Sequence, residues 1–212
     1  MKKLLLLIVI SLAIFVSCDD EDILQSLFTA KENVTPVLSA AASWSSDAKL
    51  AGIYGWNIST DGKVDLLSPT TNAFVYIVQS DSKGTNEFYV PVYAAGPVKS
   101  PINFVTMLSY VKDANAKTIL ETIFGALATT NINSTASYYD SPAVLTSMLA
   151  RPDVSSFRNS NPGSKIDMFL VPSVTLPIPG SSGYADWIVN FYSSSSSLVL
   201  YQNSQTGIIL EL

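Results

Sequence analysis

The chain has no histidine, and Cys18 is the single cysteine among its 212 residues. Without histidine, a Ser-His-Asp triad, a Cys-His dyad and a histidine-ligated zinc site cannot form. One cysteine also cannot make an intrachain disulfide or a dithiol redox pair. An enzyme built from this chain would have to work with carboxylates, lysine, tyrosine or serine alone. The composition therefore favours a protein that is not an enzyme and that holds no metal or cofactor.

A long apolar run is present at the N-terminus, where Leu4–Val16 is interrupted only by Ser11 and follows a start with two lysines. This run is shorter than the roughly 20 residues that span a bilayer. A basic start, an apolar middle and a small residue at Ser17 are typical of a secretory signal peptide. We therefore predict a signal peptide over residues 1–17.

The segment Phe15-Val16-Ser17-Cys18 resembles a bacterial lipoprotein signal, in which a small residue precedes a cysteine that is lipidated and becomes the mature N-terminus. Phe15 departs from the leucine that is usual at its position. The resemblance implies lipidation of Cys18, and two or three acyl chains at ~0.8 kcal/mol per buried methylene would anchor a soluble domain. It implies a location in the bacterial cell envelope, at the outer membrane, on its periplasmic face or at the cell surface. An ordinary secreted protein with a spare thiol is the alternative.

Basic residues are scarce, with 12 lysines and arginines against 17 acidic residues. Removal of residues 1–17 takes away two basic residues and no acidic ones, so ten remain and the formal charge becomes about −7. Nucleic-acid binding needs a concentrated basic surface, so no nucleic-acid partner is expected. The predicted tether, residues 18–35, begins with the acids Asp19–Asp22. Similar acidic runs occur in surface-exported lipoproteins of some bacterial groups, and a plain solvated tether is the alternative.

The remaining pattern predicts an α+β fold of antiparallel sheets with helices packed on one face. The first unit, residues 36–130, should open with a helix that starts at Pro36, is capped by Thr35 and ends near Ser45. Asp61-Gly62 predicts a hairpin turn. The predicted strands of this unit are 49–56, 64–67, 73–79 and 87–93, followed by an ambiguous segment at 102–111 and a helix at 114–128.

The second unit, residues 138–212, repeats the order of a helix followed by four strands. Asp140 followed by Ser141-Pro142 is typical of a helix start, and Arg151-Pro152 should end that helix. The predicted strands are 165–171, 186–192, 198–202 and 207–212, with a hairpin turn at 203–207. The shared order predicts two similar helix-plus-four-strand units.

The second half is similar to PepSY-like repeats, whose pattern is a helix, a Trp-containing strand, another strand and a Thr-Gly turn into a last strand. The matching positions are Trp187–Val189, Leu198–Leu200 and Thr206-Gly207. The first half, with "DAKLAGI" and a "DGK" turn, resembles a segment of bacterial exported proteins. The resemblance implies a cystatin-like layout in a non-catalytic envelope domain that binds or restrains proteins. It carries over no site residues.

Two local motifs match known sites only in part. Ser46 and Lys49 spell the S-x-x-K of serine acylases, but the second serine motif and the K-T-G strand are missing. Asn57, Ser59 and Asp61 match the start of a calcium loop, but Ser68 stands where the bidentate glutamate is needed. We expect neither chemistry.

The long loop and strand start from Leu176 to Trp187 is the expected contact surface, through Pro177, Pro179, Tyr184 and Trp187. Core packing is the alternative role for the tryptophan. The expected function is therefore non-catalytic binding of an envelope protein through strand edges or hairpin loops. One alternative is a small-molecule or lipid carrier with a cavity of at least ~300 Å³ between sheet and helices. Another is a glycan hydrolase with paired carboxyls roughly 5–9.5 Å apart.

Overall fold

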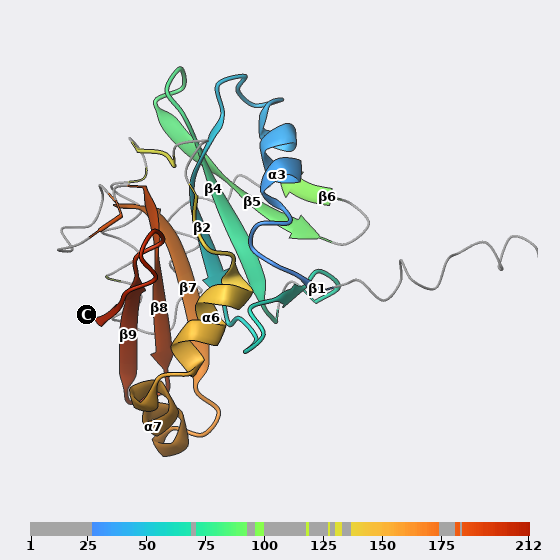
Figure 1. Cartoon of the computed structure of the whole chain (residues 1–212). Helices are drawn as coiled ribbons and strands as arrows, with labels where there is room; N and C mark the ends of the chain where they lie inside the picture. Colours follow the sequence, from blue (N-terminus) through green and yellow to red (C-terminus); the bar gives the residue numbers. More distant parts are fainter. Residues whose placement is uncertain are drawn as a thin grey trace, which may run out of the picture.

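The computed structural model describes residues 27–68, 71–92, 96–99, 118, 127, 130–132, 137–173, 181–182 and 184–212. Its main feature is an eight-stranded antiparallel sheet in the order β10-β9-β8-β7-β2-β4-β5-β6 (Figure 1). These strands are β2 (Lys49–Trp56), β4 (Ala73–Ser80), β5 (Thr85–Val92), β6 (Gly96–Lys99), β7 (Lys165–Pro172), β8 (Ala185–Tyr192), β9 (Ser197–Gln202) and β10 (Ile209–Glu211). A small second sheet pairs β1 (Leu27–Phe28) with β3 (Val64–Asp65). The predicted α+β class is confirmed.

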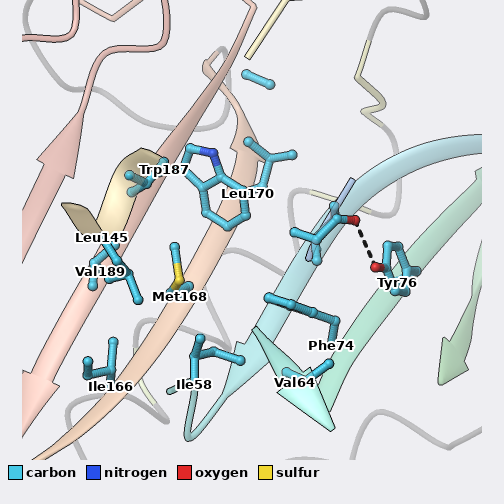
Figure 2. Packing of buried hydrophobic residues seen from close by; sticks show 14 of the residues in the cluster. Ile58, Val64, Phe74, Tyr76, Leu145, Ile166, Met168, Leu170, Trp187 and Val189 are labelled. Carbon is cyan, nitrogen blue, oxygen red and sulfur yellow. Dashed lines mark hydrogen bonds between the residues drawn. The ribbon is translucent and has the colours of Figure 1, made fainter. Parts of the chain in front are cut away.

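Three described helices pack into one core with the sheet: α3 (Val34–Ala41), α6 (Ser141–Leu149) and α7 (Pro152–Ser160). Figure 2 shows Leu145 of α6 beside Trp187 and Val189 of β8 in this core. It also shows the Tyr76 hydroxyl donating a hydrogen bond of 2.8 Å to the Ala30 carbonyl. A second cluster lies on the opposite face and includes Leu127. The three described helices thus pack on one face, as the sequence predicts, and Leu127 contacts the other.

The central strands are buried on both sides, which explains their near-continuous apolar sequences. Successive side chains of a strand point to opposite faces. In β7, Met168 and Leu170 join the core with the helices, while Phe169 and Val171 join the second cluster. An apolar residue is thus required at almost every position, and alternation cannot reveal which face is which.

Helix α6 begins where the sequence predicts, because the Asp140 side chain accepts a hydrogen bond of 2.8 Å from the Ser141 N–H. The Ser141 hydroxyl donates to the Gly62 carbonyl at 2.6 Å, which docks the helix on the loop after β2. Gly62 has φ of +77°, and a Cβ there would lie 2.5 Å from the Pro142 nitrogen. Only glycine fits this close approach.

Two local predictions are wrong for physical reasons. Asp61-Gly62 does not connect paired strands, since β2 pairs with β4 and β7 while β3 pairs with β1. Thr35 does not cap α3, because the helix starts at Val34, two residues before the predicted Pro36, and Asn33 occupies the N-cap position. Pro152 does follow the end of α6, but it also opens the unpredicted helix α7, because proline is well suited to a first helical turn.

The two halves of the chain form one continuous sheet through the antiparallel pair β2–β7, with Tyr54 opposite Phe169. The structure gives no indication that the halves are repeats of one unit. The first half inserts β3 between its strands, whereas the second half carries two helices before β7. The segment predicted at 102–111 lies outside the described residues, as does most of the helix predicted at 114–128. Within the described part of the chain, no helix is long and apolar enough to cross a membrane.

Candidate functional site at the Asp186 end of the sheet

The predicted contact residues separate into two classes. Tyr184 is 43% exposed, as a contact residue should be. Trp187 is fully buried, and its ring nitrogen donates a hydrogen bond of 2.8 Å to the Tyr139 carbonyl. Trp187 is therefore a core residue and is not available to a partner. Pro177 and Pro179 lie outside the described residues, and so does the predicted lipidation site, Cys18.

Strand alternation explains why Trp187 points inward. Trp187 and Val189 pack in the core with the helices, so their neighbours Asp186 and Ile188 must point to the opposite face. This places a carboxylate, Asp186, inside the protein with no exposed surface. A buried carboxylate is tolerated only when hydrogen-bond donors surround it. Asp186 has several such donors.

Asp186 joins separate segments of the chain at one end of the sheet. Its Oδ2 accepts hydrogen bonds from the Ser173 hydroxyl at 2.6 Å, the Tyr201 hydroxyl at 2.7 Å and the Ser182 N–H at 3.0 Å. Its Oδ1 accepts one from the Ser204 N–H at 2.8 Å. The end of β7, the start of β8 and the turn between β9 and β10 are therefore held by one side chain.

The charge state of Asp186 follows from these donors. Burial alone would raise the pKa of Asp186, but the hydrogen bonds from Ser173, Ser204, Ser182 and Tyr201 outweigh it and lower the pKa below its usual value. The carboxylate is thus ionised and acts as a fixed acceptor. Such an arrangement is typical of a structural support rather than a proton donor.

The turn supported by Asp186 is rigid in its own right. The Asn203 side chain accepts hydrogen bonds from the N–H groups of Gln205 at 2.8 Å and Thr206 at 2.9 Å. The Gly207 N–H closes the turn on the Asn203 carbonyl at 2.9 Å, with φ of +72° at Gly207. This confirms the predicted hairpin turn at 203–207, which joins β9 to β10.

Exposed apolar side chains accompany these fixed turns. Ile208 directly follows the 203–207 turn and is 57% exposed, and Leu210 and Leu212 continue at alternate positions along the edge with 40% and 56% exposed. Tyr139 is also exposed, and its hydroxyl lies 3.5 Å from where a Cβ on Gly207 would stand. We call Tyr139, Tyr184, Ile208, Leu210 and Leu212 the contact surface.

Three residues of the contact surface, Ile208, Leu210 and Leu212, lie in or beside β10, an edge strand of the sheet. At the other edge, β6 contains Pro97, which has no N–H to offer another strand. At β10, the Arg151 guanidinium reaches the Ile209 carbonyl at 3.4 Å, so part of the backbone edge is covered. A partner at this edge would therefore contact the apolar side chains of β10 more than its backbone.

A second buried carboxyl, Asp167 in β7, is 2% exposed on the same face as Asp186. It accepts hydrogen bonds from the Asn57 N–H at 2.8 Å, the Tyr54 hydroxyl at 3.1 Å and, more weakly, the Tyr192 hydroxyl at 3.5 Å. Burial raises the pKa of Asp167 to about 6, although these hydrogen bonds act to lower it. Asp167 has fewer close donors than Asp186, so its ionised form is less stabilised.

Asn190 lies directly opposite Asp167 in the β7–β8 pair. Its side-chain amide is buried, and neither its nitrogen nor its oxygen has a hydrogen-bond partner among the residues that the structure describes. An unpaired buried amide costs free energy. The polar groups around Asp167 therefore lower the stability of the second cluster.

The two buried carboxyls do not form a hydrolase pair. Asp186 pairs with Val171, four residues along β7 from Asp167. At about 3.3 Å per residue and about 4.8 Å between strands, their Cα atoms are roughly 14 Å apart. Glycosidases need carboxyls roughly 5–9.5 Å apart. Within the described residues, no three side chains of the metal-ligating types come together either.

Sequence reasoning missed Asp167, Asp186 and Asn190, although each carries a signal. Each polar residue interrupts an apolar strand, as in Lys165–Val171 and Ala185–Tyr192. A charged residue at a central position of a doubly buried strand must be surrounded by donors, so such an interruption marks a buried polar site.

No protein-family model, no curated protein and no solved structure matches this chain.

Proposed function

We propose that this protein is a lipid-anchored component of the bacterial cell envelope that binds a partner protein without catalysing a reaction. The observation that carries the proposal is the contact surface, whose exposed apolar side chains lie near Ser182 and the 203–207 turn, both held by the buried carboxylate Asp186. We propose in addition that the second half is a PepSY-like domain, whose expected role is to bind or restrain proteins.

The contact surface has the physical properties of a binding site. Exposed aromatic and aliphatic side chains on a fixed backbone lose little entropy when a partner covers them. Tyr139 and Tyr184 supply large, stiff side chains, and Ile208 adds an apolar one. Because the chain without residues 1–17 would carry a formal charge of about −7, the expected partner is a protein with an apolar patch and a basic rim.

Removing two apolar side chains should abolish the interaction. The double variant Tyr184→Ser/Ile208→Ser is expected to lose capture of its partner from an envelope extract by at least ~10-fold, because truncated hot-spot residues cost about 2 kcal/mol or more. Leu67→Ser is the matched control, since Leu67 is equally exposed but lies in the turn after β3. Capture is measured by quantitative mass spectrometry of proteins retained on the immobilised chain.

The proposal fails if the wild-type chain enriches no protein over a blank resin. It also fails if the double variant retains the same proteins as the wild type, or if Leu67→Ser loses them equally. Unchanged thermal unfolding of each variant would establish that a loss of capture reflects the surface rather than the fold.

The lipid anchor gives a separate prediction. Cys18→Ser removes the thiol that lipidation requires, and no other cysteine can replace it. The variant should leave the membrane fraction for the soluble or secreted fraction, or accumulate as an uncleaved precursor. Labelling with a palmitate analogue should mark the wild type and not the variant. A variant that still incorporates the label, or a wild type that never does, would mean that the signal is an ordinary secretory one.

A further inference from the structure

A hollow of about 390 Å³ lies beside α7 and shares no lining residue with the contact surface. It is lined by Leu149 at the end of α6, by Val154, Ser155, Arg158 and Asn159 of α7, and by Gly163-Ser164 in the turn before β7. Its volume is within the range of small-molecule sites. It opens to solvent beside the helices and is not the cavity between sheet and helices expected for a carrier.

One wall of the hollow is a fixed turn, Asn161-Pro162-Gly163-Ser164. The Ser164 N–H donates to the Asn161 carbonyl at 3.0 Å, and Gly163 has φ of +78°. Proline and glycine at the two central positions are those that a type II turn requires. The Asn161 side chain also accepts hydrogen bonds from the hydroxyls of Ser193 at 3.0 Å and Ser196 at 2.8 Å. The wall is thereby fastened to the β8–β9 hairpin.

The other wall presents an unpaired guanidinium. The chain has two arginines, and Arg151 is occupied by Asp153, with nitrogen and oxygen 2.5 Å apart. Arg158 forms no hydrogen bond or ion pair with the described residues. It lies in the last turn of α7, where the helix dipole favours a cation. Arg158 is also the one charged side chain among the described residues that line the hollow.

We propose that this hollow binds a small organic molecule that carries one anionic group, carboxylate or phosphate, and an apolar portion. The planar guanidinium of Arg158 would form two parallel hydrogen bonds to the anion. Ser155, Asn159 and Ser164 add hydroxyl and amide groups at the rim, and the half-buried Leu149 supplies apolar surface. The site is independent of the contact surface and of the function proposed above.

The two arginines make a direct test possible. Selective ¹⁵N-arginine labelling of the full chain, held in nanodiscs of neutral lipid, should give two guanidinium Nε–H signals. Hexanoate and hexyl phosphate serve as the two anionic probes, and hexanol is the neutral control. We expect at least one anionic probe to shift the Arg158 signal saturably and to leave the Arg151 signal in place. Hexanol should bind at least ~10-fold more weakly, because it lacks the charge-assisted hydrogen bonds.

A matched pair of variants completes the test, with probe binding followed through backbone amide signals. Arg158→Gln should weaken binding of the anionic probe by roughly 10- to 100-fold, whereas Lys83→Gln, which removes one exposed charge in the β4–β5 turn, should not change it. If a variant does not fold, the titration of the wild-type chain still tests the proposal. The proposal is overturned if neither anion binds, if both arginine signals move together, or if hexanol binds as well as the anions. Preference for one anion over the other would identify carboxylate or phosphate as the natural group.

Discussion

Replacing Asp186 with alanine should lower the free energy of unfolding by about 4 kcal/mol, because the substitution leaves the buried N–H of Ser204 and the partly buried N–H of Ser182 without an acceptor. An unpaired buried donor costs about 1–3 kcal/mol. The hydroxyls of Ser173 and Tyr201 lose their acceptor too, but they can rotate to find another. Urea unfolding followed by circular dichroism measures the change.

Asp186→Asn separates charge from shape. The amide has the size of the carboxylate but offers one acceptor oxygen, so its NH₂ group must face a backbone N–H on one side. We therefore expect about half the loss of the alanine variant, roughly 2 kcal/mol. Amide hydrogen exchange should show which N–H, that of Ser182 or that of Ser204, becomes unprotected.

Asp81→Ala is the control, because Asp81 is an exposed carboxylate paired with Lys49 at 2.9 Å. Exposed ion pairs contribute about 0–1 kcal/mol, so its loss should be small. If Asp186→Ala unfolds within ~1 kcal/mol of the wild type, the donors have found water and Asp186 does not hold Ser182 and the 203–207 turn together. A folded Asp186→Asn variant would then also capture the partner as well as the wild type does. That result would show that the contact surface does not depend on Asp186.

The parts of the fold that depend on local signals could be predicted from the sequence. The strand Lys49–Trp56 has the predicted bounds, and the 203–207 turn joins the two strands that flank it. The start of α6 follows from Asp140 and the proline two residues later. In each case the residues that determine the structure are neighbours in the chain.

The parts that depend on distant contacts could not be predicted. Nothing near β2 indicates that it pairs with β7, more than a hundred residues away. The orientation of Trp187 was also hidden, because β8 is apolar on both faces and shows no alternation. Tyr184 was placed correctly on the surface, whereas the support of that surface by Asp186 depends on four donors from separate segments.

Asp167 should make the stability of this protein fall as the pH rises from about 4 to about 7. Burial raises the pKa of Asp167 to about 6, above the usual value of about 3.8 for an aspartate. The folded state therefore holds a proton over a range in which the unfolded state has lost it, so stability is greatest when Asp167 is protonated. This difference in pKa corresponds to about 3 kcal/mol of unfolding free energy, at 1.36 kcal/mol for each unit of pKa.

The absence of histidine makes this effect unusually easy to isolate. No imidazole titrates between pH 5 and 8 in this chain. The carboxylates Asp81, Asp153 and Asp186 have lowered pKa values, so the stability that they contribute is present above about pH 4 and is lost as the pH falls further. The two trends together predict a maximum of stability near pH 4–5.

Asp167→Asn is the decisive variant, because the amide resembles the protonated acid. Its oxygen can accept from the Asn57 N–H, and its NH₂ group can donate to the Tyr54 hydroxyl. At pH 4 the variant should match the wild type, and at pH 7.5 it should be more stable by about 3 kcal/mol. Asp81→Asn should show no such gain between these two pH values, because the lowered pKa of Asp81 confines its effect to more acidic solution. Urea unfolding at half-unit pH intervals measures the difference, and a difference between Asp167→Asn and wild type that stays constant from pH 4 to 7.5 would show that Asp167 is already ionised in the folded protein.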